Sequence, residues 1–205
     1  SPSEFIPLAE QTGLFEVIDR WVIEKAFSGY HQMQSLFENQ VQLSINLSSA
    51  ELDSCQLATF IEQKAQQYRV PYEQVDFEIT ETFAAGSQGY PLLHELSSHG
   101  FQLAIDDFGS GYTAFTQLVQ YPVQKIKFDR EFLLAMLKSN KQHIIKPLIE
   151  LCHSQDISVT AEGVENRDMH QWLHSSGCDY MQGFYFGQPM SIERLKDCTA
   201  VLNSR

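Results

Sequence analysis

The sequence predicts an α/β fold with a mainly parallel sheet, because helical segments alternate with short β-rich runs along the whole chain. No linker, low-complexity tract or internal repeat interrupts this alternation, so the 205 residues suit one domain, or two small ones at most. A hydrophobic content of 43% is ordinary for a globular protein with a core.

The N-terminal half contains three predicted helices and three predicted strands. Residues 15–27 carry apolar side chains at helical spacing: Val17, Ile18, Trp21, Val22 and Ala26. Residues 41–47 alternate apolar and polar side chains as a strand does, and residues 54–68 return to the helical period. A second strand over 75–80, a helix over 90–98 closed by Gly100, and a third strand over 101–105 follow.

The C-terminal half continues the pattern. A short helix over 113–120, stopped at the Tyr121–Pro122 step, precedes a strand over 125–128. Residues 140–153 are helical, and Pro147 within them predicts a kink or break. The remaining predicted elements are a strand over 157–161, a helix over 167–175, a sixth strand within 179–186 and a last helix opened by Ser191.

Six strands leave two architectures open. One is an open, doubly wound sheet, and the other is a (β/α) barrel, which usually needs about 250 residues and eight strands. Either the sheet is open or two strands lie upstream of Ser1. Because the chain starts without Met and enters directly into an amphipathic pattern, we expect a fragment of a longer protein.

The net charge of -12 disfavours binding to duplex nucleic acid, which needs a basic surface. It does not exclude a phosphate ligand, because carboxylates can reach phosphate through a divalent metal. Four widely spaced cysteines without a C-x-x-C pair predict free thiols and a cytoplasmic domain, although upstream segments of a longer parent can still anchor it to a membrane.

Each predicted strand ends in a side chain that can bind metal, phosphate or a proton. These residues are Asn46, Glu78, the Asp106–Asp107 pair, Lys127, Glu162 and Gln182. Taken singly, Asn46 fits a turn residue as well as it fits a ligand-binding residue. Glu78 likewise fits an exposed strand residue as well as a ligand-binding one. Because the carboxyl ends of parallel strands meet at one edge of the sheet, we expect a single shared site.

Three of these positions have a local chemical reason. Two adjacent carboxylates at Asp106 and Asp107 repel each other, which is useful around a dication, although capping of the next element is the alternative. Lys127 stands between apolar neighbours and is costly there unless it is paired or faces a polar centre. Glu162 is flanked by an alanine and a glycine, which leave room for a ligand.

The loop after the third strand contains Phe108, Gly109, Ser110 and Gly111. Its Gly-x-Gly lacks the third glycine and the long following helix of a dinucleotide-binding fingerprint. We therefore interpret it as an active-site loop that can move.

Taken together, the motifs resemble those of EAL domains, in the family's order and over almost the whole chain. The matching stretches are 5–10 (Phe-Ile-Pro-Leu-Ala-Glu), 44–48 (Ser-Ile-Asn-Leu-Ser), 78–81 (Glu-Ile-Thr-Glu), 106–112 (Asp-Asp-Phe-Gly-Ser-Gly-Tyr), 127–129 (Lys-Phe-Asp), 161–165 (Ala-Glu-Gly-Val-Glu) and 182–186 (Gln-Gly-Phe-Tyr-Phe).

The resemblance implies an α/β fold, the (β/α)8 TIM-like barrel of EAL type with one antiparallel strand, here incomplete with about six of eight strands. It implies hydrolysis of cyclic di-GMP to linear pGpG at a site with two Mg²⁺ or Mn²⁺ ions. It assigns the metal ligands Asn46, Glu78, Asp106 and Asp107.

The other roles implied by the resemblance concern the water and the loop. Glu162 acts as metal ligand or base, Lys127 stabilises the water or the charge on phosphate, and Gln182 orients a metal-bound water. Glu81 anchors the mobile loop rather than touching the substrate.

The sequence departs from the family at its start, because the strand that carries the Glu-Ala-Leu motif is absent. We therefore expect residues 1–205 to be an EAL domain lacking its first two strands and inactive by itself. The alternative is a non-catalytic module that senses cyclic di-GMP or binds a protein. The resemblance also implies an upstream sensory or GGDEF domain and allows a homodimer.

Overall fold

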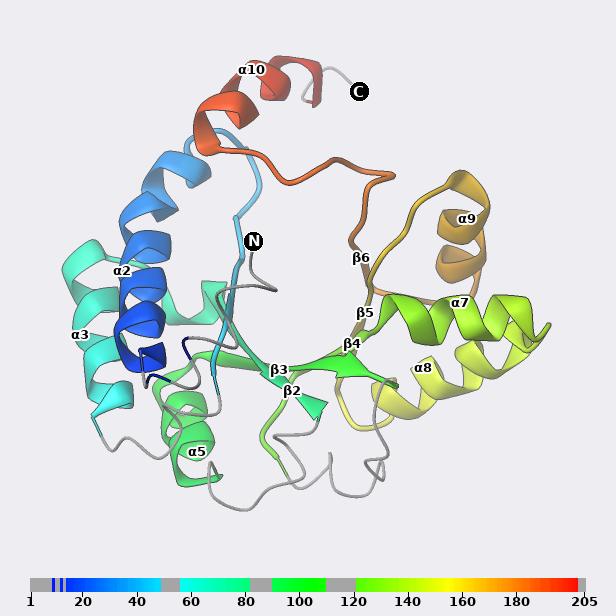
Figure 1. The fold of residues 1–205 in the computed structure, drawn as a ribbon, viewed down its shortest axis with the longest axis horizontal. Helices are drawn as coiled ribbons and strands as arrows, with labels where there is room; N and C mark the ends of the chain where they lie inside the picture. The colour runs from blue at the N-terminus through cyan, green and yellow to red at the C-terminus, as the bar shows by residue number, and fades with distance from the viewer. Residues whose placement is uncertain are drawn as a thin grey trace. The chain divides into compact units, whose positions relative to one another are not determined.

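The structure is a computed structural model and describes Ala9, Thr12 and residues 14–48, 56–81, 90–109 and 121–202. The chain divides into two compact units. Unit 1 comprises residues 1–78, 87–102 and 190–205, and unit 2 comprises residues 79–86 and 103–189. Figure 1 colours the elements of both units along the chain.

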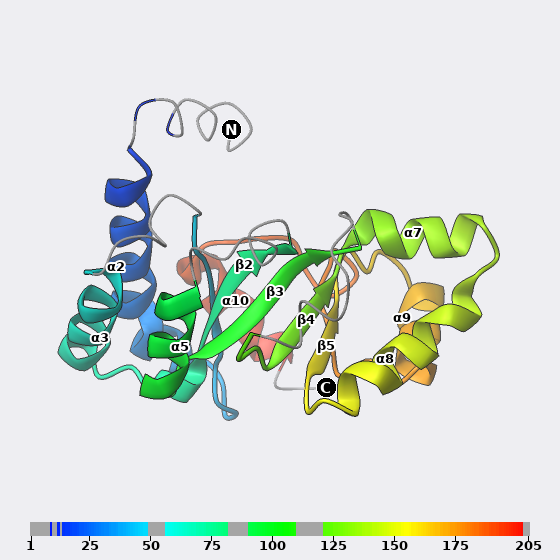
Figure 2. The same cartoon turned by 90° about the horizontal axis from the view of Figure 1, so that it is seen from below.

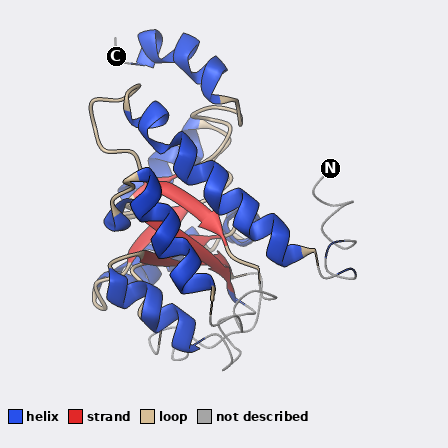
Figure 3. Cartoon of the chain, turned by 90° about the vertical axis from the view of Figure 1, so that its left-hand side faces the viewer, coloured by secondary structure: helices blue, strands red, loops and turns tan. Residues whose placement is uncertain are grey.

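Unit 1 combines helices with a pair of parallel strands. Its helical elements are α2 (Phe15–Gln34), α3 (Leu57–Tyr68), η1 (Tyr72–Gln74), α5 (Tyr90–His99) and α10 (Ile192–Leu202). Strand β1 (Leu43–Asn46) pairs with β2 (Val75–Thr80), and the register places Asn46 opposite Glu78. Helix α2 contacts both α3 and β1. Figure 2 shows α2 and α3 side by side, and Figure 3 shows the helices in blue.

The core of unit 1 follows the strand period. β1 buries Leu43 and Ile45, and the residue after each of them is exposed. Phe101 stacks on Tyr72 with a centroid distance of 4.5 Å and meets the edge of Phe77 at 5.4 Å. Burying each large apolar side chain contributes about 1.5–3 kcal/mol, so these contacts hold β2 against its neighbours.

Unit 2 contains parallel strands that pair in sequence order. They are β3 (Gln102–Phe108, in unit 2 from Leu103 on), β4 (Lys125–Phe128), β5 (Ser158–Ala161) and β6 (Tyr180–Met181). Its helical elements are α7 (Arg130–Lys138), η2 (Gln142–Ile144), α8 (Ile145–His153) and α9 (Arg167–Ser175). Figure 1 shows α7, α8 and α9 on the same side of β4 to β6, as expected of helices that connect parallel strands.

Helix α7 is absent from the elements predicted above. Asp129 caps it, because its Oδ1 accepts hydrogen bonds from the N–H groups of Glu131 (2.9 Å) and Phe132 (3.0 Å). Leu133 is fully buried on its inner face. Asp129 belongs to the Lys-Phe-Asp motif at residues 127–129, and its capping role was not predicted. An aspartate at this position is a signal for the start of a helix.

The helical stretch predicted over 140–153 is broken into η2 and α8, and the break lies just before Pro147 rather than at it. Pro147 lies in the first turn of α8, which begins at Ile145. The first N–H groups of a helix have no intrahelical acceptor, so proline removes no hydrogen bond there. The irregularity comes earlier, where η2 passes into α8.

Some predictions concern residues outside the described ranges. These are the helix over 113–120, the stretch 5–10 apart from Ala9, and Ser110 and Gly111 of the loop. Among the described cysteines, Cys152, Cys178 and Cys198 are free thiols, as predicted. Within the same ranges, every helix is too short or too polar to cross a bilayer.

Candidate functional site

A β-bulge at the end of β3 determines the shape of the site in unit 2. Ile105 pairs with Ile126 and Phe108 with Phe128, so β3 has two residues, Asp106 and Asp107, where β4 has one. In a regular strand, adjacent side chains point to opposite faces. The extra residue, together with the left-handed φ of 56° at Asp107, allows both carboxylates to reach the same cluster.

Lys127 is the β4 residue opposite this bulge and lies among the carboxylates. Its Nζ is 3.0 Å from Oδ1 of Asp106 and 2.6 Å from Oε1 of Glu162, which directly follows β5. Lys127 is 5% exposed. A buried ammonium group is costly unless it is paired, and here two carboxylates pair with it. The polar environment that the sequence requires for Lys127 is therefore present.

The carboxylates of Asp106, Asp107 and Glu162 form a group that fits a divalent metal. One oxygen from each lies within 4.8 Å of the others. Asp106 Oδ1 is shielded from solvent and accepts no hydrogen bond from the described residues, and the ammonium of Lys127 lies 3.0 Å away as an ion-pair partner. Carboxylate oxygens are the ligands that Mg²⁺ and Mn²⁺ prefer, and a buried oxygen without a donor suits direct coordination.

The electrostatics of Asp107 reflect this crowding. Desolvation raises the pKa of Asp107 above its ordinary value of 3.8, the negative charges of Asp106 and Asp129 raise it further, and Lys127 lowers it in part. A cation bound among these carboxylates would relieve the repulsion that raises the pKa.

The base of the loop after β3 is fixed by two contacts within unit 2. The buried Glu81 accepts a hydrogen bond of 2.9 Å from the N–H of Gly109 through Oε2. Phe108 stacks near Phe128 at a centroid distance of 5.6 Å and meets the edge of Phe132 at 6.3 Å. A Cβ on Gly109 would lie 2.5 Å from the Phe132 ring, so this position needs glycine.

Gln182 follows β6 as an exposed side chain, and its backbone links two loops. Its N–H donates to the carbonyl of Ala161 (2.9 Å), and its carbonyl accepts from the N–H of Val164 (3.0 Å). A Cβ on the next residue, Gly183, would lie 2.2 Å from the carbonyl oxygen of Val164. The chain after β6 therefore packs directly on the turn that carries Glu162.

The other two predicted ligands belong to unit 1. Asn46 is the exposed last residue of β1, and its register partner Glu78 is 5% exposed. The turn after Asn46 is held by Asp19 of α2, whose carboxylate accepts hydrogen bonds from the N–H (3.2 Å) and the hydroxyl of Ser48. Asp19 has no recognisable signal in the sequence, because a single acidic residue on a helix is ordinarily solvated.

Comparison with known proteins gives a consistent result. The EAL domain family model matches residues 1–189. The biofilm architecture maintenance protein MbaA of Vibrio cholerae serotype O1 is 64% identical over 195 residues, 95% of this chain and 25% of that protein. Cyclic di-GMP phosphodiesterase PdeB of Shewanella oneidensis is 34% identical over 94% of this chain and 23% of its own length. The chain thus spans about a quarter of the length of these relatives.

The solved structures agree with the family match. A structure described as "PaMucR Phosphodiesterase, c-di-GMP complex" is similar with a TM-score of 0.87 and 29% identity, over 95% of this chain and 80% of that one. The predicted fold class, the TIM-like α/β barrel of EAL type, is confirmed by this likeness. Since the family model covers nearly the whole length, the chain belongs to the EAL domain family.

Proposed function

We propose that this chain is the catalytic part of a cyclic di-GMP phosphodiesterase that hydrolyses the cyclic dinucleotide to linear pGpG. The observation that carries the proposal is the cluster of Asp106, Asp107 and Glu162 around the buried Lys127. The match to the EAL family and the likeness to a phosphodiesterase structure with bound cyclic di-GMP support the choice of substrate.

The carboxylates of Asp106 and Asp107, together with Asn46 and Glu78, would hold Mg²⁺ or Mn²⁺ ions, two in the complete domain. Bound there, the metal would supply positive charge for a substrate whose phosphates an acidic site otherwise repels, and it would lower the pKa of water. For Asp106 and Asp107, this proposal is supported by the closeness of their carboxylates to that of Glu162 and by the buried Oδ1 of Asp106, which accepts no hydrogen bond from the described residues.

The residues of the chain would then act on the attacking water and the phosphate. Glu162 would accept a proton from the attacking water as the water oxygen bonds to phosphorus. The opposite P–O bond of the ring would break, and the leaving oxygen would take a proton from solvent water to become a hydroxyl group. Lys127, held by Asp106 and Glu162, would stabilise the water or the charge on the phosphate oxygens. Gln182 orients the water from the end of β6.

The loop of Phe108, Gly109, Ser110 and Gly111 would order the site when the substrate binds. The hydrogen bond from the N–H of Gly109 to Glu81 supports the role of Glu81 as its anchor. Coupling between loop and ligands is a common way in which substrate binding completes a catalytic site.

We further propose that residues 1–205 form one EAL domain whose first two strands, with the Glu-Ala-Leu motif, come from an upstream segment. In the PaMucR phosphodiesterase structure, about a fifth of the chain lies outside the match. This remainder is consistent with two additional strands. We also propose an upstream sensory or GGDEF domain. The relatives are about four times as long as this chain, which leaves length for further domains. A cytoplasmic location and a homodimer stay predictions.

The first test measures turnover of cyclic di-GMP by the full-length protein, with and without Mg²⁺ or Mn²⁺. D106A should abolish the metal-dependent hydrolysis, because it removes an acceptor from the centre of the cluster. D168A, which removes an exposed carboxylate from the same unit, is the matched control. Unchanged turnover in D106A would refute the metal role.

A second outcome separates catalysis from sensing. If the full-length protein binds cyclic di-GMP but releases no pGpG with either metal, the non-catalytic module is correct. Activity of the 205-residue chain by itself, equal to that of the full-length protein, would contradict the need for upstream strands.

A further inference from the structure

The turn that carries Glu162 is held by an ion pair outside the cluster. Arg130, the first residue of α7, donates hydrogen bonds from Nε (2.9 Å) and Nη2 (2.6 Å) to Oε1 of Glu165. Arg130 lies three residues after Lys127, and Glu165 lies three residues after Glu162. The ion pair therefore connects the segment after β4 to the segment after β5. Lys127 and Glu162, which contact each other, lie just before Arg130 and Glu165 in these segments.

The stem of Arg130 makes a second contact with the same turn. Gly163, the residue next to Glu162, has a left-handed φ of 63°. A Cβ there would lie 2.4 Å from Cγ and 2.6 Å from Cδ of Arg130. The aliphatic part of the arginine thus lies directly against the Gly163 backbone, while its guanidinium binds Glu165 two residues further on.

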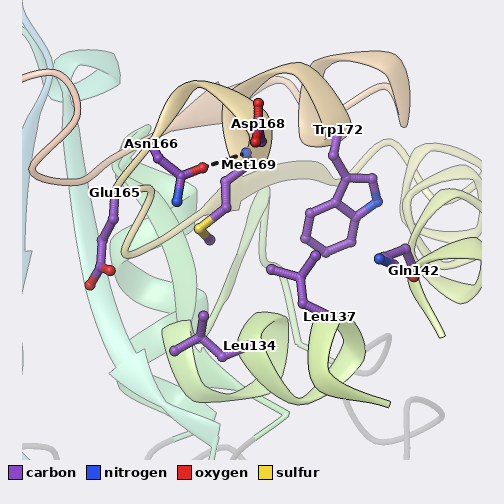
Figure 4. Close-up of a pocket in the computed structure, with 8 residues that line it drawn as sticks. All are labelled: Leu134, Leu137, Gln142, Glu165, Asn166, Asp168, Met169 and Trp172. Carbon is purple, nitrogen blue, oxygen red and sulfur yellow. Dashed lines mark hydrogen bonds between the residues drawn. The ribbon is translucent and has the colours of Figure 1, made fainter. Parts of the chain in front are cut away.

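Both ends of this contact are themselves fixed. Asp129 caps α7 and so sets the position from which Arg130 starts. On the opposite side, Val164 donates to the carbonyl of Gln182 and accepts a hydrogen bond of 3.0 Å from the N–H of Tyr185. Figure 4 shows Glu165 at one end of a pocket of about 470 Å³ between α7 and α9, with Trp172 at the other end.

The ion pair is poorly suited to stabilise the fold. The side chains of Arg130 and Glu165 are 43% and 44% exposed, and exposed ion pairs contribute little to stability because water and salt screen them. The guanidinium also contacts Glu131. Arg130 therefore binds the carboxylates of both Glu165 and Glu131.

Resting on the proposed function, we propose that Arg130 and Glu165 are positioning residues that hold the carboxylate of Glu162 against Lys127 and the metal ligands. The 2.6 Å contact between Lys127 and Glu162 leaves little tolerance for movement of the turn. Residues that orient a metal ligand or base, without touching the substrate, typically change metal affinity or activity 10- to 100-fold when removed.

The test uses the full-length protein and the variants R130M, E165Q, R130M/E165Q and R130K. R130M should lower kcat about 10- to 100-fold with KM nearly unchanged, while its melting temperature stays close to that of the wild type. The kcat of the double variant should equal that of R130M, because both substitutions break the same Arg130–Glu165 contact. R130K should recover part of kcat, because a lysine can still pair with Glu165.

A readout without turnover is the affinity for Mn²⁺ alone, measured by calorimetry. R130M should weaken Mn²⁺ binding about 10-fold. R167M is the matched control, because Arg167 is an exposed arginine two residues beyond Glu165 at the first position of α9. R167M should leave both Mn²⁺ affinity and kcat at the wild-type values.

The outcomes are distinguishable. A wild-type protein that turns over cyclic di-GMP, with an R130M variant that matches it in kcat and Mn²⁺ affinity, overturns this inference alone. Additive effects of R130M and E165Q, or loss of kcat only in proportion to lost folded protein, also overturn it. A wild type that neither hydrolyses the dinucleotide nor binds Mn²⁺ overturns both the inference and the proposed function.

Discussion

Unit 1 and unit 2 both place polar side chains at the carboxyl ends of their strands, but they stabilise them in different ways. In unit 2, three carboxylates lie within 4.8 Å of one another and a buried lysine contacts two of them. In unit 1, Glu78 has the uncharged Asn46 as its register partner, and a hydrogen-bonded aspartate holds the following turn.

This difference indicates that carboxylates placed close together need a compensating positive charge before they can form a binding site. Carboxylates at such distances repel one another, and repulsion destabilises the native state unless a cation lies among them. Lys127 supplies that cation in the protein itself. At the strand end of unit 1, the described contact is instead the pair of hydrogen bonds that Ser48 donates to Asp19.

Removing the cation should have the largest effect. K127M leaves Asp106 and Glu162, whose side chains are 14% and 19% exposed, without their ammonium partner. Breaking a buried ion pair on one side typically costs about 3–5 kcal/mol. The free energy of unfolding from urea titration should fall by about that amount, and added Mn²⁺ should restore more stability to K127M than to the wild type.

Lys125 on the same strand provides the control. Its Nζ lies 5.1 Å from the centroid of the Tyr180 ring, a cation–π contact that contributes about 0.5–1 kcal/mol at a partly exposed site. K125M should therefore destabilise the protein less than K127M does and should show no special response to Mn²⁺. Equal losses in K125M and K127M would show that Lys127 does not balance the cluster.

The sequence predicted the elements whose signal is local. The strand over 75–80 and the helix over 167–175 were predicted with the bounds that β2 and α9 have, because each combines a clear period with polar flanks. Helix α7 was missed although Asp129 supplies a capping signal. The break predicted within 140–153 is present, but it lies before Pro147 because proline fits the first turn of α8.

The candidate site was predicted as a set of strand-end residues, and its geometry was not. Nothing in two adjacent aspartates reveals a bulge, since the extra residue is defined only by the pairing of β3 with β4. Arg130 and Glu165 are 35 residues apart, and Asp19 and Ser48 are 29 apart. Such contacts depend on tertiary packing, which local sequence patterns do not report.

Within unit 1, the next largest effect should come from Asp19. D19A leaves the N–H and hydroxyl of Ser48 without their acceptor, which should cost about 1–3 kcal/mol. D19N keeps an acceptor oxygen and should cost less. D197N, which removes the same charge from an exposed position on α10, is the control for a general effect of charge.

Asp19 also predicts a dependence on pH. Burial raises the pKa of Asp19 above 3.8, and the hydrogen bonds from Ser48 lower it in part. Because the folded-state pKa is the higher one, the stabilisation from protonating Asp19 is fully present below about pH 3.8 and is lost as pH rises through the folded-state value. The stability of the wild type relative to D19N should therefore increase as the pH falls from 7 to 3.8. A difference that stays constant or decreases over this range contradicts the assignment.

The smallest expected effect concerns local opening of unit 2, which cysteine labelling can measure. Burial raises the pKa values of Cys152 and Cys178 to about 11, with a contribution from the negative charge of Asp179. At pH 8 their thiolate fraction should be about 100-fold below that of an ordinary thiol, so a thiol reagent should react correspondingly slowly. Single-cysteine variants followed by mass spectrometry give each rate.

Cys198 on α10 reports on unit 1 in the same experiment. If K127M accelerates the labelling of Cys152 and Cys178 together but leaves Cys198 unchanged, the uncompensated carboxylates weaken unit 2 without opening unit 1. If all three thiols accelerate equally, the two units unfold as one, and the difference in how they stabilise their polar residues has no separate effect on their stability. Labelling of Cys152 and Cys178 in the folded wild type at the rate of the urea-unfolded chain would contradict the burial of both thiols.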